Sequence, residues 1–248
     1  MWVSLFLYPN IYYNVDMAGS TFMTIVYALI AGVLPSLIWL AFWLREDSHS
    51  EPRSLITAIF FGGVLAVVVA ILVEGYIGKV VTDQKLQYAL WAATEEILKF
   101  IVVASIAIRS ASYDEPIDAM VYCIVAALGF AALENTLFIL DPFSKGLMAR
   151  GILSDNMRFM GATLVHIASS ATVGAFLGFT FYRSRLAKMI AIVLGLVVAI
   201  GLHTSFNLSL MNSIDWSDTL RTFAWFWGAI VILMILFEEV KVVRPGVL

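Results

Sequence analysis

Long apolar stretches alternate with short polar ones along most of the chain. A helix needs about 20 apolar residues to cross a hydrocarbon core about 30 Å thick, and the sequence supplies that length seven times. The predicted spans are residues 22–44, 55–77, 87–109, 117–140, 158–182, 187–211 and 220–240. Because backbone groups in lipid must be hydrogen-bonded within their own segment, each span should be a helix. The pattern predicts an all-α fold, a single polytopic membrane bundle of about seven transmembrane helices over residues 1–248.

The composition excludes several other classes of protein. Of the 248 residues, 61% are hydrophobic and 13% are charged, and the mean hydropathy is +0.92. Soluble domains are nearer half apolar and a quarter charged. The net charge of -3, without a basic cluster, argues against a nucleic-acid partner. The single cysteine, Cys123, excludes an intramolecular disulfide and a cysteine-rich metal site, so any metal must use histidine and carboxylate ligands.

Residues 1–21 precede the first predicted span. They lack a basic region followed by a small-residue cleavage site, so we expect no removable signal peptide. Aromatic residues gather here, as they do at membrane interfaces: Trp2, Tyr8, Tyr12 and Tyr13. We expect this segment to lie along the membrane surface as an interfacial anchor.

The loops between spans indicate an orientation. With the N-terminus outside and the C-terminus in the cytoplasm, the inner loops hold eight Lys and Arg residues and the outer loops hold six. Positive residues favour the cytoplasmic side. The run from Arg183 to Lys188, between the fifth and sixth spans, contributes most to this difference. The expected location is the cell membrane, with the N-terminus out.

Ionisable and amide side chains lie inside four of the spans. They are Glu95, Glu96 and Lys99 in the third, Glu134 and Asn135 in the fourth, His166 in the fifth, and His203 and Asn207 in the sixth. Charge inside a bilayer is expensive, so such residues indicate a functional site. At 1.5 Å per residue, the acidic residues and histidines lie roughly 9 to 12 Å from a membrane face. Because successive helices run in opposite directions, these groups should share one layer.

Small residues flank the two histidines at helical spacing. Ala162, His166 and Ser170 follow one another at steps of four, and Ala199, His203 and Asn207 do the same. Residues four apart share a helix face, and small residues let membrane helices approach closely. Both histidines should therefore point into the bundle. Any one buried polar residue could be structural, forming a hydrogen bond between helices, but the whole set exceeds what helix adhesion needs.

The set of buried groups suits hydrolysis by either of two routes. Two imidazoles and a carboxylate form a catalytic zinc site with an open position for water, and a further glutamate would be the general base. Asn135 and Asn207 are neutral donors that would hold a carbonyl oxygen as it gains charge. In a metal-free version, a glutamate activates the water while histidine and asparagine stabilise the oxyanion. The residues alone leave both routes open.

Four motifs occur in a fixed order along the chain. They are Glu95-Glu96-x-x-Lys99, residues 114–118 leading into residues 129–135, His166 with Gly174, and His203-x-x-x-Asn207. Asp47 and Glu51-Pro52 in the first loop fit the same pattern. Together these motifs resemble the PrsW family of intramembrane proteases over about residues 24–210. That family is related to the CAAX prenyl proteases, which share the paired glutamate, a later histidine and a final His-x-x-x-Asn.

The resemblance implies a function and a cellular setting. The protein would be a prokaryotic intramembrane endopeptidase that hydrolyses a peptide bond of a membrane-anchored protein. The best-known role of the family is site-1 cleavage of an anti-sigma factor on its extracytoplasmic side. That side matches the expected polar layer if the N-terminus lies outside.

The resemblance also implies residue roles. The catalytic residues would be Glu95, Glu96, His166, His203 and Asn207, with Lys99 and Asn135 in support. The family is classed with metallopeptidases, so the implied cofactor is zinc, held by Glu134, His166 and His203. The related prenyl proteases have also been argued to work through glutamate without a metal.

Two other classes of protein use similar buried groups. A transporter or proton relay would employ buried carboxylates and histidines, and usually shows an internal repeat and discontinuous helices. We find no repeat in the sequence. A bis-histidine haem protein would use His166 and His203 but leaves the paired glutamates unexplained.

Overall fold

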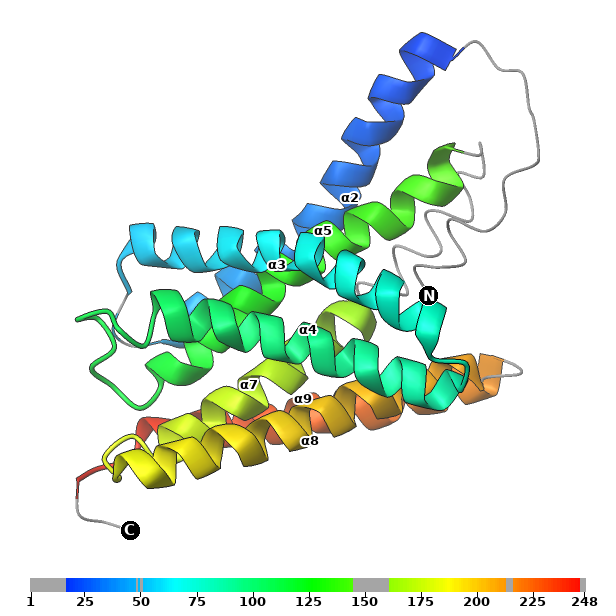
Figure 1. Ribbon diagram of the computed structural model, residues 1–248. Helices are drawn as coiled ribbons and strands as arrows, with labels where there is room; N and C mark the ends of the chain where they lie inside the picture. The colour runs from blue at the N-terminus through cyan, green and yellow to red at the C-terminus, as the bar shows by residue number, and fades with distance from the viewer. Residues whose placement is uncertain (1–16, 48, 50, 145–160, 213–215, 246–248) are drawn as a thin grey trace.

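The computed structural model describes residues 17–47, 49, 51–144, 161–212 and 216–245 (Figure 1). Within these ranges it contains seven α-helices and no strand: α2 (Met17–Glu46), α3 (Arg53–Val80), α4 (Gln84–Ile106), α5 (Asp118–Ser144), α7 (Thr163–Phe179), α8 (Arg185–Met211) and α9 (Trp216–Lys241). The predicted all-α membrane bundle is confirmed. The expected interfacial anchor falls on residues 1–16, outside the described residues, and on the first turn of α2.

Five of the described helices are long and apolar enough to cross a membrane. These segments are Phe22–Glu46, Arg53–Val80, Asp118–Leu140, Arg185–Met211 and Ser217–Lys241. They agree with five of the seven predicted spans and identify a multi-pass membrane protein. Side chains on their outer faces are apolar and exposed, for example Leu72 and Leu186 at 72% and 66%. Such surfaces suit contact with lipid tails.

The other two predicted spans are helical but differ from a plain apolar span. Helix α4 corresponds to the predicted span 87–109. Any segment of α4 that is long enough to cross a bilayer includes the charged residues Glu95, Glu96 and Lys99. These three side chains are buried inside the protein, so α4 shields its charge from lipid. The described part of α7 has 17 residues, against the predicted 158–182, of which residues 158–160 lie outside the described chain.

Helix α5 is the centre of the bundle. It packs against α2, α3, α4 and α7 (Figure 1). Residues 116–132 are buried without interruption, which is the behaviour of a helix that is apolar on every face. Glu134 and Asn135, just beyond that stretch, are buried as well.

Glycines allow α5 to approach its neighbours closely. A Cβ on Gly129 would collide with the carbonyl oxygen of Phe60 in α3, and a Cβ on Gly63 would collide with that of Ala126 in α5. Gly174 of α7 lies against the α5 backbone in the same way. Membrane helices use small residues at such crossings because backbone contact then replaces side-chain contact.

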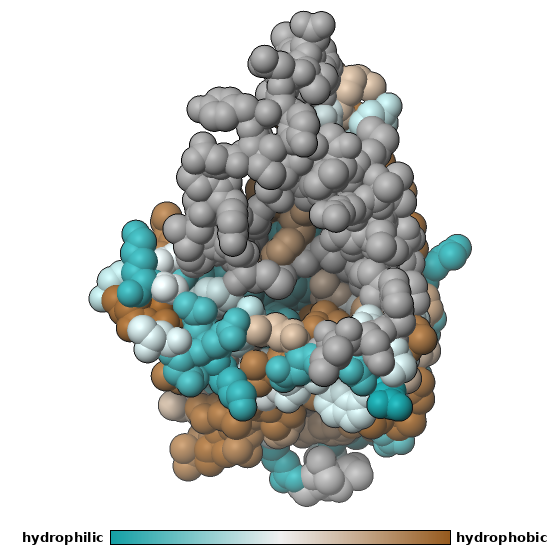
Figure 2. Space-filling view, turned by 90° about the vertical axis from the view of Figure 1, so that its right-hand side faces the viewer, coloured by the Kyte–Doolittle hydropathy of each residue, from teal (hydrophilic) through white to brown (hydrophobic). Residues whose placement is uncertain are grey.

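The two ends of the bundle differ in their chemistry. Figure 2 views the end where α4 begins and α8 ends, and polar residues gather across its middle with hydrophobic surface below them. At the other end, Tyr122 donates a hydrogen bond to Glu51 at 2.6 Å, and Asp118 accepts two backbone N–H groups from residues 114 and 115. Burial raises the pKa of the Glu51 carboxyl. The acidic motifs of the first and third loops thus join the loops to α5, away from the histidines.

The close crossing of α3 and α5 predicts a stability difference between two glycine substitutions. Gly129→Ala should lower the free energy of unfolding by about 1–3 kcal/mol, because the new methyl group forces the two backbones apart. Gly228→Ala is the matched control, since nothing lies within 4 Å of its Cβ position, and it should leave stability equal or slightly higher. Denaturation in detergent micelles measures both. Equal effects of the two substitutions would contradict this packing.

Candidate active site

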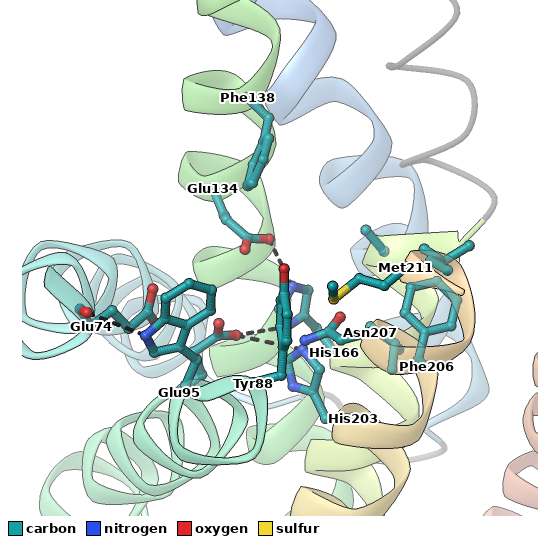
Figure 3. Close-up of a pocket in the computed structure, with 14 residues that line it drawn as sticks. Glu74, Tyr88, Glu95, Glu134, Phe138, His166, His203, Phe206, Asn207 and Met211 are labelled. Atoms are coloured by element: carbon teal, nitrogen blue, oxygen red, sulfur yellow. Dashed lines mark hydrogen bonds and ion pairs between the residues drawn. The ribbon is translucent and has the colours of Figure 1, made fainter. Parts of the chain in front are cut away.

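Five helices contribute polar side chains to one cavity of about 200 Å³ (Figure 3). The polar lining consists of Glu74 from α3, Glu95 from α4, Glu134 from α5, His166 from α7, and His203 and Asn207 from α8. Aromatic and aliphatic residues complete the wall, among them Tyr88, Trp91, Phe138, Phe206 and Met211. The cavity combines apolar walls with a few convergent polar groups, as binding and active sites do.

Glu95 lies between the two histidines. Its Oε2 atom is 3.8 Å from Nδ1 of His166 and 3.7 Å from Nε2 of His203. The side chain is buried, and this oxygen accepts no hydrogen bond within the described part of the chain. A buried carboxylate oxygen without a partner is costly and indicates that a ligand or a reacting group belongs there.

Each histidine is held by a second glutamate on its far side. His166 Nε2 is 2.9 Å from Oε2 of Glu134, and His203 Nδ1 is 2.8 Å from Oε1 of Glu96. A carboxylate accepts, so this network assigns the ring protons to these two nitrogens. The remaining nitrogen of each ring, which carries a lone pair, then faces Glu95.

Glu96 has a different environment from its neighbour Glu95. It accepts from Lys99 Nζ at 2.6 Å and from Ser170 Oγ at 3.0 Å, in addition to His203. All its partners are buried, and Lys99 lies 5.2 Å from the centre of the Phe130 ring. The two adjacent glutamates therefore have different roles: Glu96 positions His203, and Glu95 faces the cavity.

Three of these residues form a group that could hold a metal ion. Ligand atoms of Glu95, His166 and His203 all lie within 4.8 Å of one another. Two imidazoles with one carboxylate match catalytic zinc sites, and the carboxylates behind both rings match the outer shell of such sites. Lys99 Nζ lies 3.2 Å from Nδ1 of His166, so that contact must open before this nitrogen binds a cation.

This group differs from the ligand set expected from the sequence. That set combined the two histidines with Glu134, whereas the structure brings Glu95 to the lone-pair side of both rings. Glu134 instead contacts the opposite nitrogen of His166. The difference arises because α4 and α5 approach the histidines from different sides, which residue depth alone does not specify.

The two asparagines have separate positions. Asn207 lines the cavity one helical turn after His203. Asn135 is buried outside the cavity lining and donates a hydrogen bond to Thr163 Oγ1 at 2.9 Å, which connects α5 to α7. Of the two, Asn207 is thus the one placed to contact a molecule in the cavity.

Glu74 is a cavity residue that the sequence analysis did not single out. It lies three residues before the end of the predicted span 55–77, where a charged side chain ordinarily reaches the interface. In the structure α3 continues to Val80, and Glu74 is 1% exposed. If the span had been predicted to continue to residue 80, Glu74 would have lain more than one turn inside an apolar helix. A carboxylate in that position indicates a functional residue.

Comparison with known proteins gives consistent matches. The model of a family described as PrsW family intramembrane metalloprotease matches residues 51–237. A protein named Protease PrsW from Geobacillus kaustophilus is 30% identical over 164 residues, which cover 63% of this chain and 66% of that relative, just under two thirds of its length. The protein of that name from Bacillus subtilis is 26% identical over 82% of this chain and 93% of its own length. No solved structure matches the chain.

The buried pair of Lys99 and Glu96 predicts a large effect on stability. Lys99→Met should cost about 3–5 kcal/mol of unfolding free energy, because it leaves a buried carboxylate without its cation. Lys241→Met is a matched control. It removes an equally short pair with Glu238 at the same spacing on an exposed helix end, and should cost less than about 1 kcal/mol. Denaturation in detergent compares the two, and similar losses would contradict the role of Lys99.

Proposed function

The chain belongs to the PrsW family of intramembrane metalloproteases, and from this premise we propose that it hydrolyses a peptide bond of a membrane-anchored protein at Glu95. The observation that carries the proposal is the unpartnered oxygen of Glu95, which faces the lone-pair nitrogens of His166 and His203 inside a cavity. A carboxylate, two imidazoles and room for water are the components that amide hydrolysis requires.

The chain's own residues account for the proton transfers. Glu95 accepts a proton from a water molecule while the oxygen of that water molecule attacks the carbonyl carbon of the scissile bond. The amide of Asn207 donates to the carbonyl oxygen as negative charge develops there. Glu95 then returns the proton to the leaving nitrogen, and the C–N bond breaks. Glu96 and Glu134 keep the two imidazoles in one orientation throughout.

A zinc ion fits this site by its donor set. Glu95, His166 and His203 would hold it. When bound, zinc would polarise the carbonyl group and make water more acidic. Glu95 is then a ligand, whereas in the metal-free route it is the proton acceptor, so both routes require this carboxylate.

The substrate and the side of cleavage follow from the resemblance and the loop charges. We infer a single-span protein of the anti-sigma-factor type, cleaved near the outer membrane face, with the N-terminus of the protease outside. The excess of Lys and Arg in loops at the opposite end supports this orientation. The order of the motifs also supports a distant relationship to the CAAX prenyl proteases.

The geometry favours hydrolysis over the two alternative functions, a transporter or proton relay and a bis-histidine haem protein. Helices α4, α5 and α8 continue through their site residues without a break, unlike the discontinuous helices of many transporters. The rings of His166 and His203 contact each other edge to face, with 5.0 Å between centroids. That contact leaves no space for a porphyrin between them.

The proposal predicts that cleavage depends on Glu95. Purified protein would be reconstituted into liposomes with single-span proteins extracted from a bacterial membrane, and new N-termini would be identified by mass spectrometry. Glu95→Gln should reduce cleavage at least about 100-fold, since general-base catalysis contributes that much. Glu239→Gln, on the exposed face of α9, is the matched control and should cleave normally. Undiminished cleavage by a folded Glu95→Gln variant would reject the proposal.

The metal assignment has its own test. Wild-type protein dialysed against zinc should retain about one ion per chain, and His166→Ala should lose it. His49→Ala is the matched control, because His49 is exposed in a loop at the other end of the bundle and should leave zinc binding unchanged. Elemental analysis measures both. Cleavage that persists in chelator-treated, zinc-free protein would assign the chemistry to Glu95 without a metal.

A further inference from the structure

Glu74 is buried in the cavity beside the Glu95 carboxyl. Its side chain is 1% exposed, and no amide, hydroxyl or cationic group of the described residues donates a hydrogen bond to either of its carboxylate oxygens. Figure 3 shows it entering from α3, on the side of Glu95 away from the histidines. It stands outside the group of ligand atoms that Glu95 forms with His166 and His203. The proposed hydrolysis leaves this carboxylate without a role.

One member of an aromatic pair, Trp91, borders Glu74. Tyr88 and Trp91 of α4 line the same cavity and contact each other edge to face, with 5.1 Å between centroids. The indole N–H of Trp91 donates to the backbone oxygen of Glu74 at 3.2 Å. That bond fixes the indole beside Glu74 and leaves its N–H unable to serve the carboxylate.

Carboxyl groups predominate among the polar side chains of this part of the cavity. Glu74, Glu95 and Glu134 all line it, and no Lys or Arg is among the described residues that do. Lys99 does not line the cavity; it pairs with Glu96, and its Nζ lies 3.2 Å from Nδ1 of His166, on the histidine side of Glu95. A buried carboxyl group is stable only when it is protonated or paired with a positive charge, so a cationic occupant would stabilise Glu74 in its charged form.

The residues around Glu74 favour one kind of cationic ligand over another. A metal ion needs several donor atoms close together, and the group that meets this requirement lies on the histidine side of Glu95. Among the described residues, the Glu95 carboxyl and the indole of Trp91 lie beside Glu74, with no histidine in contact. Aromatic rings next to a carboxylate suit a side chain with an aliphatic stem and a cationic head.

We propose that Glu74, Tyr88 and Trp91 form a substrate subsite that receives a Lys or Arg side chain close to the scissile bond. The subsite deepens the hydrolase function proposed above and rests on it. The two rings would contact the aliphatic stem and the cation, and the Glu74 carboxylate would accept its hydrogen bonds. Lys and Arg are common where a membrane segment meets the interface. The protease would thus select bonds at the end of a membrane anchor.

The cleavage-site profile tests the subsite. In the liposome experiment, wild-type protein should cut mainly where Lys or Arg occupies one fixed position relative to the broken bond. Glu74→Gln should lose that preference while still cutting sites that lack a cation there. Glu239→Gln is again the control and should keep the wild-type profile.

A substrate change paired with the enzyme change sharpens the test. Replacing the selected Lys of one identified substrate with Met should reduce kcat/KM of the wild-type protease about 10- to 100-fold, which is the scale of a hydrogen bond to a charged group. With Glu74→Gln, the same replacement should change kcat/KM less than about 3-fold, because the two substitutions remove one interaction.

The outcomes separate this proposal from the function on which it rests. No cleavage by the wild-type protein would reject the hydrolase function itself. Cleavage without any Lys or Arg preference would overturn the subsite and leave the function standing. A Glu74→Gln variant that keeps the preference but loses bound zinc would also overturn it, by assigning Glu74 to the metal. If Glu74→Gln does not fold, the Lys-to-Met substrate still decides with wild-type enzyme, since an unchanged kcat/KM rejects the subsite.

Discussion

Compensation of buried charge within the bilayer is the constraint on which the structure depends. Lys99 and Glu96 form a buried ion pair; the same Oε1 atom of Glu96 also accepts from His203, and its Oε2 atom accepts from Ser170. In a low-dielectric interior such a pair is tolerable only when its other hydrogen-bonding capacity is also satisfied. Satisfying it requires α4, α7 and α8 to meet at one point. The same contacts that make the charges tolerable also hold His203 in one orientation.

The central helix, α5, supplies the carboxylate that orients the other histidine, again through contacts between buried polar groups. Helix α5 is enclosed by its neighbours, and backbone contacts at Gly129 and Gly174 bring α3 and α7 close to it. Glu134 projects from this enclosed helix to the far nitrogen of His166. Both imidazoles are thereby oriented by carboxylates from other helices. Glu95 turns an unpartnered oxygen toward both rings, so Glu96 and Glu134 orient the imidazoles and Glu95 faces the cavity.

Much of the fold follows from local patterns in the sequence. Apolar length predicts helices, so all seven appear near their expected positions, and charge within an apolar stretch predicts that α4 turns inward. Depth counting also places the acidic residues and histidines in one layer. Helix ends are less well determined, because backbone hydrogen bonds can continue past the last apolar residue. The extension of α3 to Val80 is such a case, and because of it the burial of Glu74 could not be predicted from the hydrophobic pattern.

The sequence by itself determined the seven helices seen in the described parts of the chain and the residues that had to avoid lipid, because these depend on hydrophobicity and helical period along one segment. Only the tertiary structure decided the division of roles among the carboxylates. Glu95 and Glu96 are adjacent in the chain, yet their side chains diverge around α4, one to the cavity and the other to Lys99. Which nitrogen of each histidine faces Glu95, why Asn135 pairs with Thr163, and where Glu74 points all depend on how five helices are rotated about their axes relative to one another. Those rotations are set by packing between segments far apart in the chain.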